Sequence, residues 1–139
     1  MIFNGSSPRK GRFIAVIDEL RRGAKRTHWM WFIFPQVLGS GHSPMATRYA
    51  IRSKDEAVAY LATPTLSARL VECTGLVLAT PDKSAHEIFG SPDDIKFRSS
   101  MTLFAEVDRG GALYQQALDR FFDGKPDVAT LNILKHWDR

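Results

Sequence analysis

Between residues 53 and 137 the chain is divided by closely spaced helix start and stop signals, and this punctuation limits the possible fold more than any other feature. Start signals stand at Ser53, Thr63, Ser84 and Asp127, each just before apolar residues at helical spacing. Side chains of these types accept a hydrogen bond from a backbone N–H that the first helical turn leaves without a partner. Both serines are followed after three positions by glutamate, the spacing of a capping box. The segments are therefore predicted to be helices.

The strongest start is the sequence SPDD at residues 91–94, in which Ser91 is expected to cap the helix and two carboxylates lie near the positive end of its dipole. The connections are short, and no alternating strand pattern competes with the helical one. We predict an all-α fold, a single compact, irregular domain of about six to eight helices over residues 12–139. Residues 1–11 are expected to be an irregular lead-in.

A chain of 139 residues, 44% of them hydrophobic, is long enough for one domain with its own core. The single cysteine, Cys73, excludes an intrachain disulfide and a multi-cysteine zinc site. The sequence holds no apolar run of membrane-spanning length and no signal-peptide core. We therefore expect a cytoplasmic protein that does not contact a membrane.

Basic residues are concentrated in the first 26 residues, which hold seven of them against two acidic residues. Such a segment attracts acidic partners, although most charge runs are only solvated helix faces. One hypothesis is therefore a non-catalytic interaction module for an acidic protein or a nucleic acid, with a nucleic acid the less expected partner. The residues that would make this contact are Arg21, Arg22, Lys25 and Arg26.

The sequence contains no established signature of a phosphate loop, a dinucleotide site, a serine hydrolase or a zinc protease. Its four histidines, at positions 28, 42, 86 and 136, have no short-range metal-ligand spacing. We therefore expect no metal site and no cofactor.

The segment from His28 to Gln36 places two tryptophans and two phenylalanines within six residues. Rings of this size are costly to expose, so most are expected to form a core around which the helices pack. The functional alternative is that Trp29 or Trp31 stacks on a flat ligand such as a nucleobase. His28 or Gln36 would then orient that ligand. His28 would carry the proton in any catalytic step, because imidazole titrates near neutral pH.

A glycine-bearing loop leads into a helix start at Ser43 that has no carboxylate in its first turn. The N–H groups of such a start, with Arg48 one turn later, form the best anion site in the sequence. The structural alternative is that Ser43 caps only its own helix and that Arg48 pairs with a surface acid.

A further polar face lies on the helix that follows residue 91, where Lys96, Ser99, Ser100 and Leu103 share one side by their spacing. This face is either solvent surface or the wall of a pocket, with Lys96 as its cation and Ser99 as a donor. The functional interpretation requires the aromatic segment, Ser43 and Lys96 to converge in space.

Several blocks of the sequence together resemble a known family. The blocks are KRTHWMWFIFPQ at 25–36, SPMA at 43–46, RYAI at 48–51, IFGSPDDIK at 88–96 and SSMTLF at 99–104. Over roughly residues 13–134 the chain is similar to the domain-of-unknown-function family 1810 of bacteria and some eukaryotes. The resemblance implies a small, mainly helical domain without an established activity. Members sometimes carry the label calpastatin, but no segment here resembles a calpain-inhibitory repeat.

The resemblance also shows one departure. Family members usually begin with an additional amphipathic segment before the first helix, where this chain has irregular sequence. Apolar surface exposed there would favour a homodimer over a monomer.

The main functional hypothesis is a pocket that binds a small anionic, nucleotide-like molecule, with or without turnover. The residues expected to line this pocket are His28, Trp29, Trp31, Gln36, Ser43, Arg48, Lys96 and Ser99. The interaction module described above is the alternative.

Overall fold

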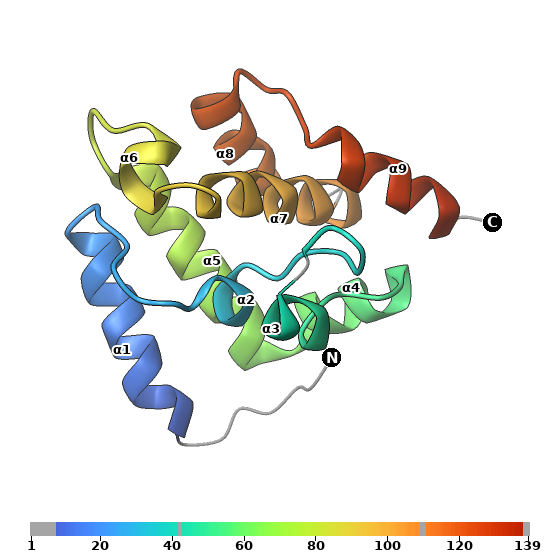
Figure 1. Ribbon diagram of the computed structural model, residues 1–139, viewed down its shortest axis with the longest axis horizontal. Coiled ribbons are helices and arrows are strands. Elements are labelled where there is room, and N and C mark those ends of the chain that lie inside the picture. Colours follow the sequence, from blue (N-terminus) through green and yellow to red (C-terminus); the bar gives the residue numbers. More distant parts are fainter. Residues whose placement is uncertain (1–7, 42, 109–110, 138–139) are drawn as a thin grey trace.

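The computed structural model describes residues 8–41, 43–108 and 111–137, which form nine α-helices (Figure 1). The helices are α1 (Pro8–Arg21), α2 (Met30–Ile33), α3 (Pro44–Arg48), α4 (Lys54–Ala62), α5 (Pro64–Ala79), α6 (Ala85–Phe89), α7 (Asp93–Val107), α8 (Leu113–Phe122) and α9 (Val128–Trp137). Within the described residues the only β-type pairings are two isolated bridges, Val37 with Ile51 and Leu38 with Gly41. The predicted all-α fold is confirmed. The helix number exceeds the expected range because α2, α3 and α6 have only four or five residues each.

The helix starts agree with the predicted caps at most positions. Ser84 forms the full capping box with Glu87, and Ser53 Oγ accepts from the backbone N–H of Glu56 at 3.1 Å. At the start of α9, Asp127 Oδ2 accepts from the backbone N–H of Thr130 at 3.0 Å. These bonds satisfy donors that the first turn would otherwise leave exposed.

Two predicted boundaries differ from the structure. The first helix begins at Pro8, so residues 8–11 are helical and only residues 1–7 of the expected lead-in lie outside the described residues. Proline is tolerated at this position because its missing N–H would have no helical partner. The prediction that Ser91 caps α7 is wrong. Pro92 occupies the cap position, without a side-chain hydrogen bond, and Asp93 and Asp94 supply the charge in the first turn.

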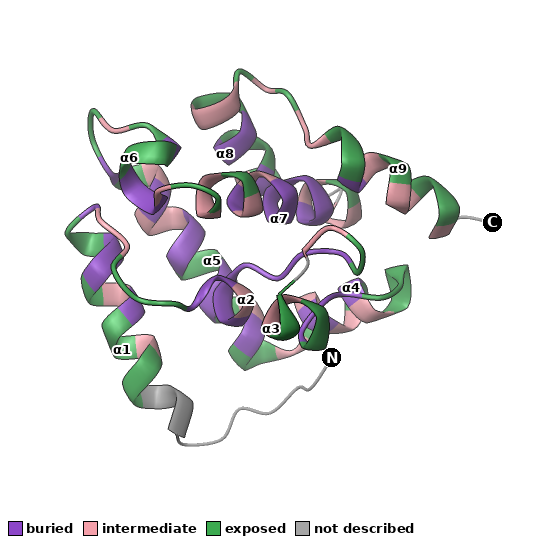
Figure 2. Ribbon diagram, in the orientation of Figure 1, coloured by how far each residue is buried: buried purple, intermediate pink, exposed green. Residues whose placement is uncertain are grey.

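The helix α7 lies at the centre of the molecule and contacts α2, α4, α6, α8 and α9 (Figures 1 and 2). Its Phe97, Met101 and Phe104 have no exposed surface. The ring of Phe97 lies 5.0 Å from that of Phe34, edge to face, a geometry that aromatic pairs favour. The aromatic segment therefore packs directly against α7, and this contact brings residues near position 35 close to residues near position 97.

The segment after α2 is held in an extended course beside α7. The backbone carbonyl of Gln36 accepts from the N–H of Ile51 at 2.8 Å, and the N–H of Leu38 donates to the carbonyl of Ile51 at 2.9 Å. Because two backbone bonds fix this segment, the side chains of Gln36 and Ser40 have a defined position relative to α7.

Candidate functional site

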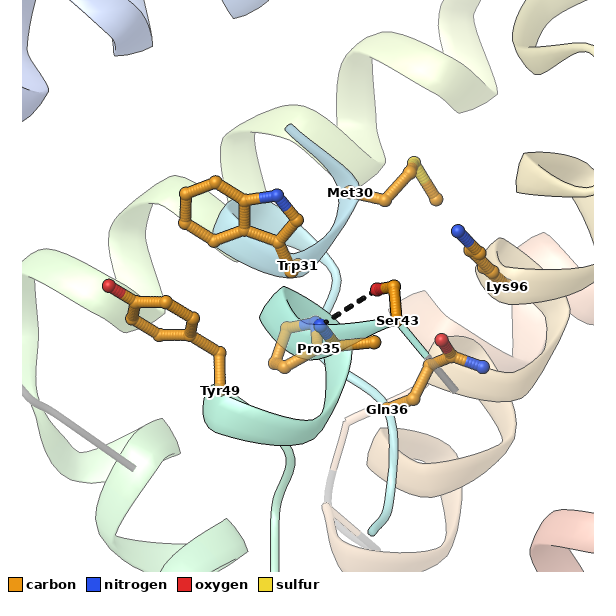
Figure 3. Close-up of a pocket in the computed structure, with 8 residues that line it drawn as sticks. Met30, Trp31, Pro35, Gln36, Ser43, Tyr49 and Lys96 are labelled. Atoms are coloured by element: carbon orange, nitrogen blue, oxygen red, sulfur yellow. Dashed lines mark hydrogen bonds between the residues drawn. The ribbon is translucent and has the colours of Figure 1, made fainter. Parts of the chain in front are cut away.

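Two adjoining hollows lie where the segment after α2 meets α7. The smaller hollow, of about 20 Å³, is lined by Met30, Trp31, Pro35, Gln36, Ser43, Ala46, Tyr49 and Lys96 (Figure 3). The larger hollow, of about 390 Å³, is lined by Gln36, Ser40, Gly41, Pro92, Ile95, Lys96, Ser99, Asp127 and Ala129. Gln36 and Lys96 line both hollows and therefore form the boundary between them.

The structure brings together five of the residues that the sequence singled out. Trp31, Gln36, Ser43 and Lys96 surround the smaller hollow, and Gln36, Lys96 and Ser99 contribute to the larger one. The three segments that needed to converge thus do so, although they are separated by up to about seventy residues of chain. Figure 3 shows Gln36 and Lys96 at one edge of the smaller hollow and Trp31 and Tyr49 at the opposite edge.

Lys96 is the cation of this site. Its Nζ lies 3.5 Å from Asp93 Oδ1, whereas Lys25 Nζ lies 2.7 Å from Asp93 Oδ2. The side chain of Lys25 is 5% exposed and that of Lys96 is 31% exposed. Because the shorter contact and the deeper burial both belong to Lys25, Asp93 is chiefly the partner of Lys25. Lys96 therefore presents positive charge to the hollows.

Trp31 and Tyr49 form the aromatic edge of the smaller hollow. Their rings are stacked, with centroids 4.8 Å apart, and the guanidinium of Arg12 lies 5.2 Å from the Trp31 ring. The rings already cover each other's faces, and the smaller hollow has room for little more than one water molecule. A flat ligand therefore does not fit between Trp31 and Tyr49 as they stand.

Four side chains that line the larger hollow are joined, through Thr130, by a series of hydrogen bonds that we call the polar chain. Its bonds join Gln36 Nε2 to Ser40 Oγ (3.1 Å), Ser40 Oγ to Ser99 Oγ (3.2 Å), Ser99 Oγ to Thr130 Oγ1 (2.7 Å) and Thr130 Oγ1 to Asp127 Oδ2 (2.6 Å). Ser99 and Thr130 are buried, with 1% and 0% exposure. The polar chain thus connects the segment after α2 to the start of α9 through α7.

Trp29 does not line either hollow, contrary to its predicted role. Its ring is 1% exposed, its Nε1 donates to Glu19 Oε1 at 3.0 Å, and Lys25 Nζ lies 5.2 Å from the ring centroid. Trp29 and Trp31 are two positions apart at the start of a helical turn, where side chains so spaced point to nearly opposite sides. One ring therefore enters the core while the other is partly buried against it.

His28 and Arg48 also lie away from the hollows formed by the described residues. His28 is exposed and precedes α2. Arg48 is exposed at the end of α3, with its guanidinium 5.7 Å from the ring of Tyr49. Two predicted roles therefore have no residue at this site. His28, the expected proton carrier, and Arg48, the expected anion contact, line neither hollow.

Ser43 lines the smaller hollow, but its hydroxyl serves its own helix. Its Oγ accepts from the backbone N–H of Ala46 at 3.0 Å, which Figure 3 shows as a dashed line. The helix α3 has only five residues, so its dipole is small. The structural alternative considered for Ser43 therefore describes the helix start better than an anion site does.

Four residues of the site are not predicted as such from the sequence: Ser40, Tyr49, Asp127 and Thr130. Asp127 was assigned as a helix cap, a role that it does have, and Thr130 follows it at the position that a cap would bond. The available signal was the presence of small hydroxyl residues at buried helical positions, because a buried hydroxyl needs a partner. That signal does not indicate which partner it is.

The basic N-terminal surface is smaller than its sequence suggests. The side chain of Lys25 is buried and bonded to Asp93, and the exposed Arg22 pairs with Asp18 at 3.1 Å. Of the four basic residues proposed for an acidic partner, Arg21 and Arg26 are exposed without an ion pair among the described residues. The surface proposed to bind an acidic partner therefore carries fewer unpaired positive charges than the sequence suggests.

No set of three or more histidine, cysteine or acidic side chains in the described part of the chain is arranged to hold a metal ion. His42 lies outside the described residues. None of the described helices is both long and apolar enough to cross a membrane.

The fold and the two hollows define the class of protein, a small all-α domain with a polar site of unassigned function. The family described as a protein of unknown function, DUF1810, matches residues 6–134, and the chain belongs to this family. The chain is also similar to the conserved hypothetical protein Rv1873 from Mycobacterium tuberculosis, whose crystal structure is known. The two are 45% identical over 93% of this chain and 99% of that chain, with a TM-score of 0.85. No curated protein matches this chain.

Proposed function

We propose that the protein binds a small anionic, nucleotide-like molecule in the larger hollow. The observation that carries the proposal is the convergence of Lys96, Gln36 and the polar chain around about 390 Å³ of space. Ligand sites typically combine an apolar lining with a few fixed polar groups in a volume of this order. The hollow has this composition, since Pro92, Ile95 and Ala129 supply its apolar surface.

The proposed roles follow from the chemistry of the lining. Lys96 attracts the anionic group, because its side chain is 31% exposed and its neighbouring carboxylate is held by Lys25. Pro92 and Ile95 contact the flat part of the ligand, and the 57% exposure of Ile95 leaves apolar surface for this contact. Trp31 borders the smaller hollow beyond Lys96 and is not needed for stacking.

The proposal is for binding without an assigned turnover step. His28, which was the expected proton carrier, is exposed and borders neither of the two hollows.

A location in the cytoplasm remains part of the proposal. It is supported by the unpaired thiol of Cys73, which is typical of proteins in a reducing compartment.

The test is a thermal-shift and calorimetric screen with nucleoside monophosphates and sugar phosphates. We expect at least one nucleotide to raise the unfolding temperature, and the Lys96→Met variant to weaken its binding about tenfold, since a charge-assisted contact is lost. Lys54→Met is the matched control, because Lys54 is an exposed lysine at the start of α4 and borders neither hollow. Absence of binding, or equal loss in both variants, would contradict the proposal.

The interaction module is a less well supported alternative, because the side chain of Lys25 is buried and Arg22 already has an acidic partner. It predicts binding to an acidic protein or nucleic acid that weakens steeply with salt. Replacing Arg21 and Arg26 by glutamine would abolish such binding. Affinity that is insensitive to salt would exclude it.

A further inference from the structure

The polar chain has hydrogen bonds whose direction follows from counting hydrogens. Near neutral pH an aspartate carboxylate only accepts, so Thr130 must give its single hydroxyl hydrogen to Asp127 Oδ2, 2.6 Å away. Thr130 then has no hydrogen left for Ser99. The 2.7 Å contact between their hydroxyl oxygens therefore requires Ser99 to be the donor.

The same argument continues to Gln36, at the boundary between the two hollows. Because Ser99 has given its hydrogen to Thr130, the 3.2 Å contact with Ser40 requires Ser40 to donate. Ser40 then accepts from Gln36 at 3.1 Å, and the Gln36 group that faces it must be the amide nitrogen. Each hydrogen bond in the polar chain thus points toward Asp127.

This direction fixes how Gln36 presents its amide. A glutamine amide is readily turned over, and which end faces a partner depends on the hydrogen-bond network around it. Here the network holds Nε2 on Ser40, which leaves Oε1 on the other side. A Cβ built on Gly41 would lie 3.0 Å from Oε1, so the glycine leaves this acceptor uncovered.

The larger hollow consequently offers mostly acceptors to a ligand. The hydroxyl hydrogens of Ser40 and Ser99 are used within the polar chain, whereas Gln36 Oε1 and the Asp127 carboxylate are acceptors. Lys96 is the charged donor and lies where the two hollows meet, and the second hydrogen of Gln36 Nε2 is the other donor that these side chains keep. A ligand that fits must bring its own N–H groups to the polar chain and its negative charge to Lys96.

We infer that the ligand is a nucleotide whose base carries an exocyclic amino group, and that Thr130 is a positioning residue that sets this preference through Ser99, Ser40 and Gln36. The inference rests on the proposed function and adds the donor pattern of the base. A buried acceptor left without a donor costs binding energy, so a base without the amino group binds more weakly.

The test compares AMP and CMP with purine riboside 5′-monophosphate and 2-pyrimidinone riboside 5′-monophosphate, which lack the amino group. We expect the wild-type protein to bind AMP or CMP about tenfold more tightly than the matching analogue. In Thr130→Val, which keeps the shape of the side chain, Ser99 loses its acceptor. Ser99 can then donate to Ser40, Ser40 to Gln36, and the Gln36 amide turns its nitrogen toward the ligand. The preference for the amino group should disappear.

Thr130→Ser is the conservative control, because it retains the hydroxyl and should retain the preference. If Thr130→Val does not fold, Ser99→Ala is the second variant. It removes the hydroxyl that joins Ser40 to Thr130 and should also remove the preference. Binding of AMP or CMP with no preference over the analogues, or with a preference that Thr130→Val and Ser99→Ala leave unchanged, overturns this inference while the proposed function stands. Absence of binding by all four nucleotides also overturns this inference, and absence of binding across the whole screen of nucleoside monophosphates and sugar phosphates overturns the proposed function as well.

Discussion

The indole Nε1 of Trp29 donates a hydrogen bond to Glu19 Oε1 at 3.0 Å and thereby ties the aromatic segment to α1. Glu19 is 7% exposed and also accepts from the backbone N–H groups of Arg26 and Thr27 and from the Thr27 hydroxyl. Burial alone would raise the pKa of Glu19, but these four hydrogen bonds outweigh it and lower the pKa to about 2. The turn between α1 and α2 is therefore built around a buried carboxylate.

The pH dependence of stability is expected to reflect this carboxylate. A carboxyl whose pKa falls from 4.5 to about 2 on folding stabilises the protein by about 3 kcal/mol at neutral pH. This stabilisation is complete above pH 4.5 and is lost as the pH falls toward 2. Glu19→Gln should lower the free energy of unfolding by about this amount at pH 7, and the difference from wild type should vanish near pH 2.

Chemical denaturation at several pH values measures this effect. Glu106→Gln is the control, because Glu106 is exposed on α7 and should change the curve little. A Glu19→Gln deficit that stays constant between pH 5 and pH 2 would show that packing, rather than the charge, accounts for the loss.

Arg69 on α5 is expected to be replaceable by a residue without charge. Arg69 is 9% exposed, its guanidinium lies 5.0 Å from the ring of Phe13 and 5.3 Å from the ring of Phe32, and its Nη1 has no hydrogen-bond partner among the described residues. A buried cation loses its hydration, and the ring faces replace only part of it. Arg69→Met should therefore unfold at the same temperature as wild type or higher.

Arg69→Ala provides the comparison, because it removes the side-chain volume together with the charge. We expect it to cost about 2 kcal/mol or more in chemical denaturation, from lost packing against the two rings. If Arg69→Met were destabilised as much as Arg69→Ala, the charge itself would be required.

Gly41→Ala should damage the site directly. A Cβ at position 41 would lie 2.8 Å from Ala46 Cβ, closer than such atoms approach, and 3.0 Å from Gln36 Oε1. The loop must shift to accommodate it, at a cost of about 1–3 kcal/mol, and the shift displaces the boundary between the hollows. We expect lower stability together with weaker nucleotide binding.

Gly75→Ala is the matched glycine substitution for that measurement. Its added Cβ would meet no atom within 4 Å, and it lies inside α5, where alanine is favoured over glycine by about 0.5–1 kcal/mol. Denaturation should show a gain for Gly75→Ala and a loss for Gly41→Ala. If both substitutions changed the free energy of unfolding equally, the close contacts beside Gly41 would not be the cause of the loss.

Much of the secondary structure was predictable, because the signals that start a helix are local. The caps at Ser53, Ser84 and Asp127 involve atoms within three residues of each other and form wherever the chain continues as a helix. The prediction at Ser91 was wrong because the chain enters α7 one residue later, with Pro92 in the cap position.

The candidate site was only partly predictable. Gln36, Lys96 and Ser99 were expected at a pocket and line one, but the pattern that singled them out did not include Ser40, Thr130 or Asp127. Whether a polar residue is a helix cap or a member of a hydrogen-bond network depends on what packs beside it. Lys25 illustrates the same point, because the sequence placed it on a basic surface and Asp93 holds it inside.

The sequence by itself determined that this protein is a set of short helices around an aromatic segment, since apolar spacing and capping act within a few residues. Only the tertiary structure decided that Trp29 enters the core on Glu19 while Trp31 is partly buried beside a hollow, and that Lys96 and Gln36 line the same two hollows. The physical reason is that such placements depend on contacts between residues distant along the chain, which no local pattern specifies.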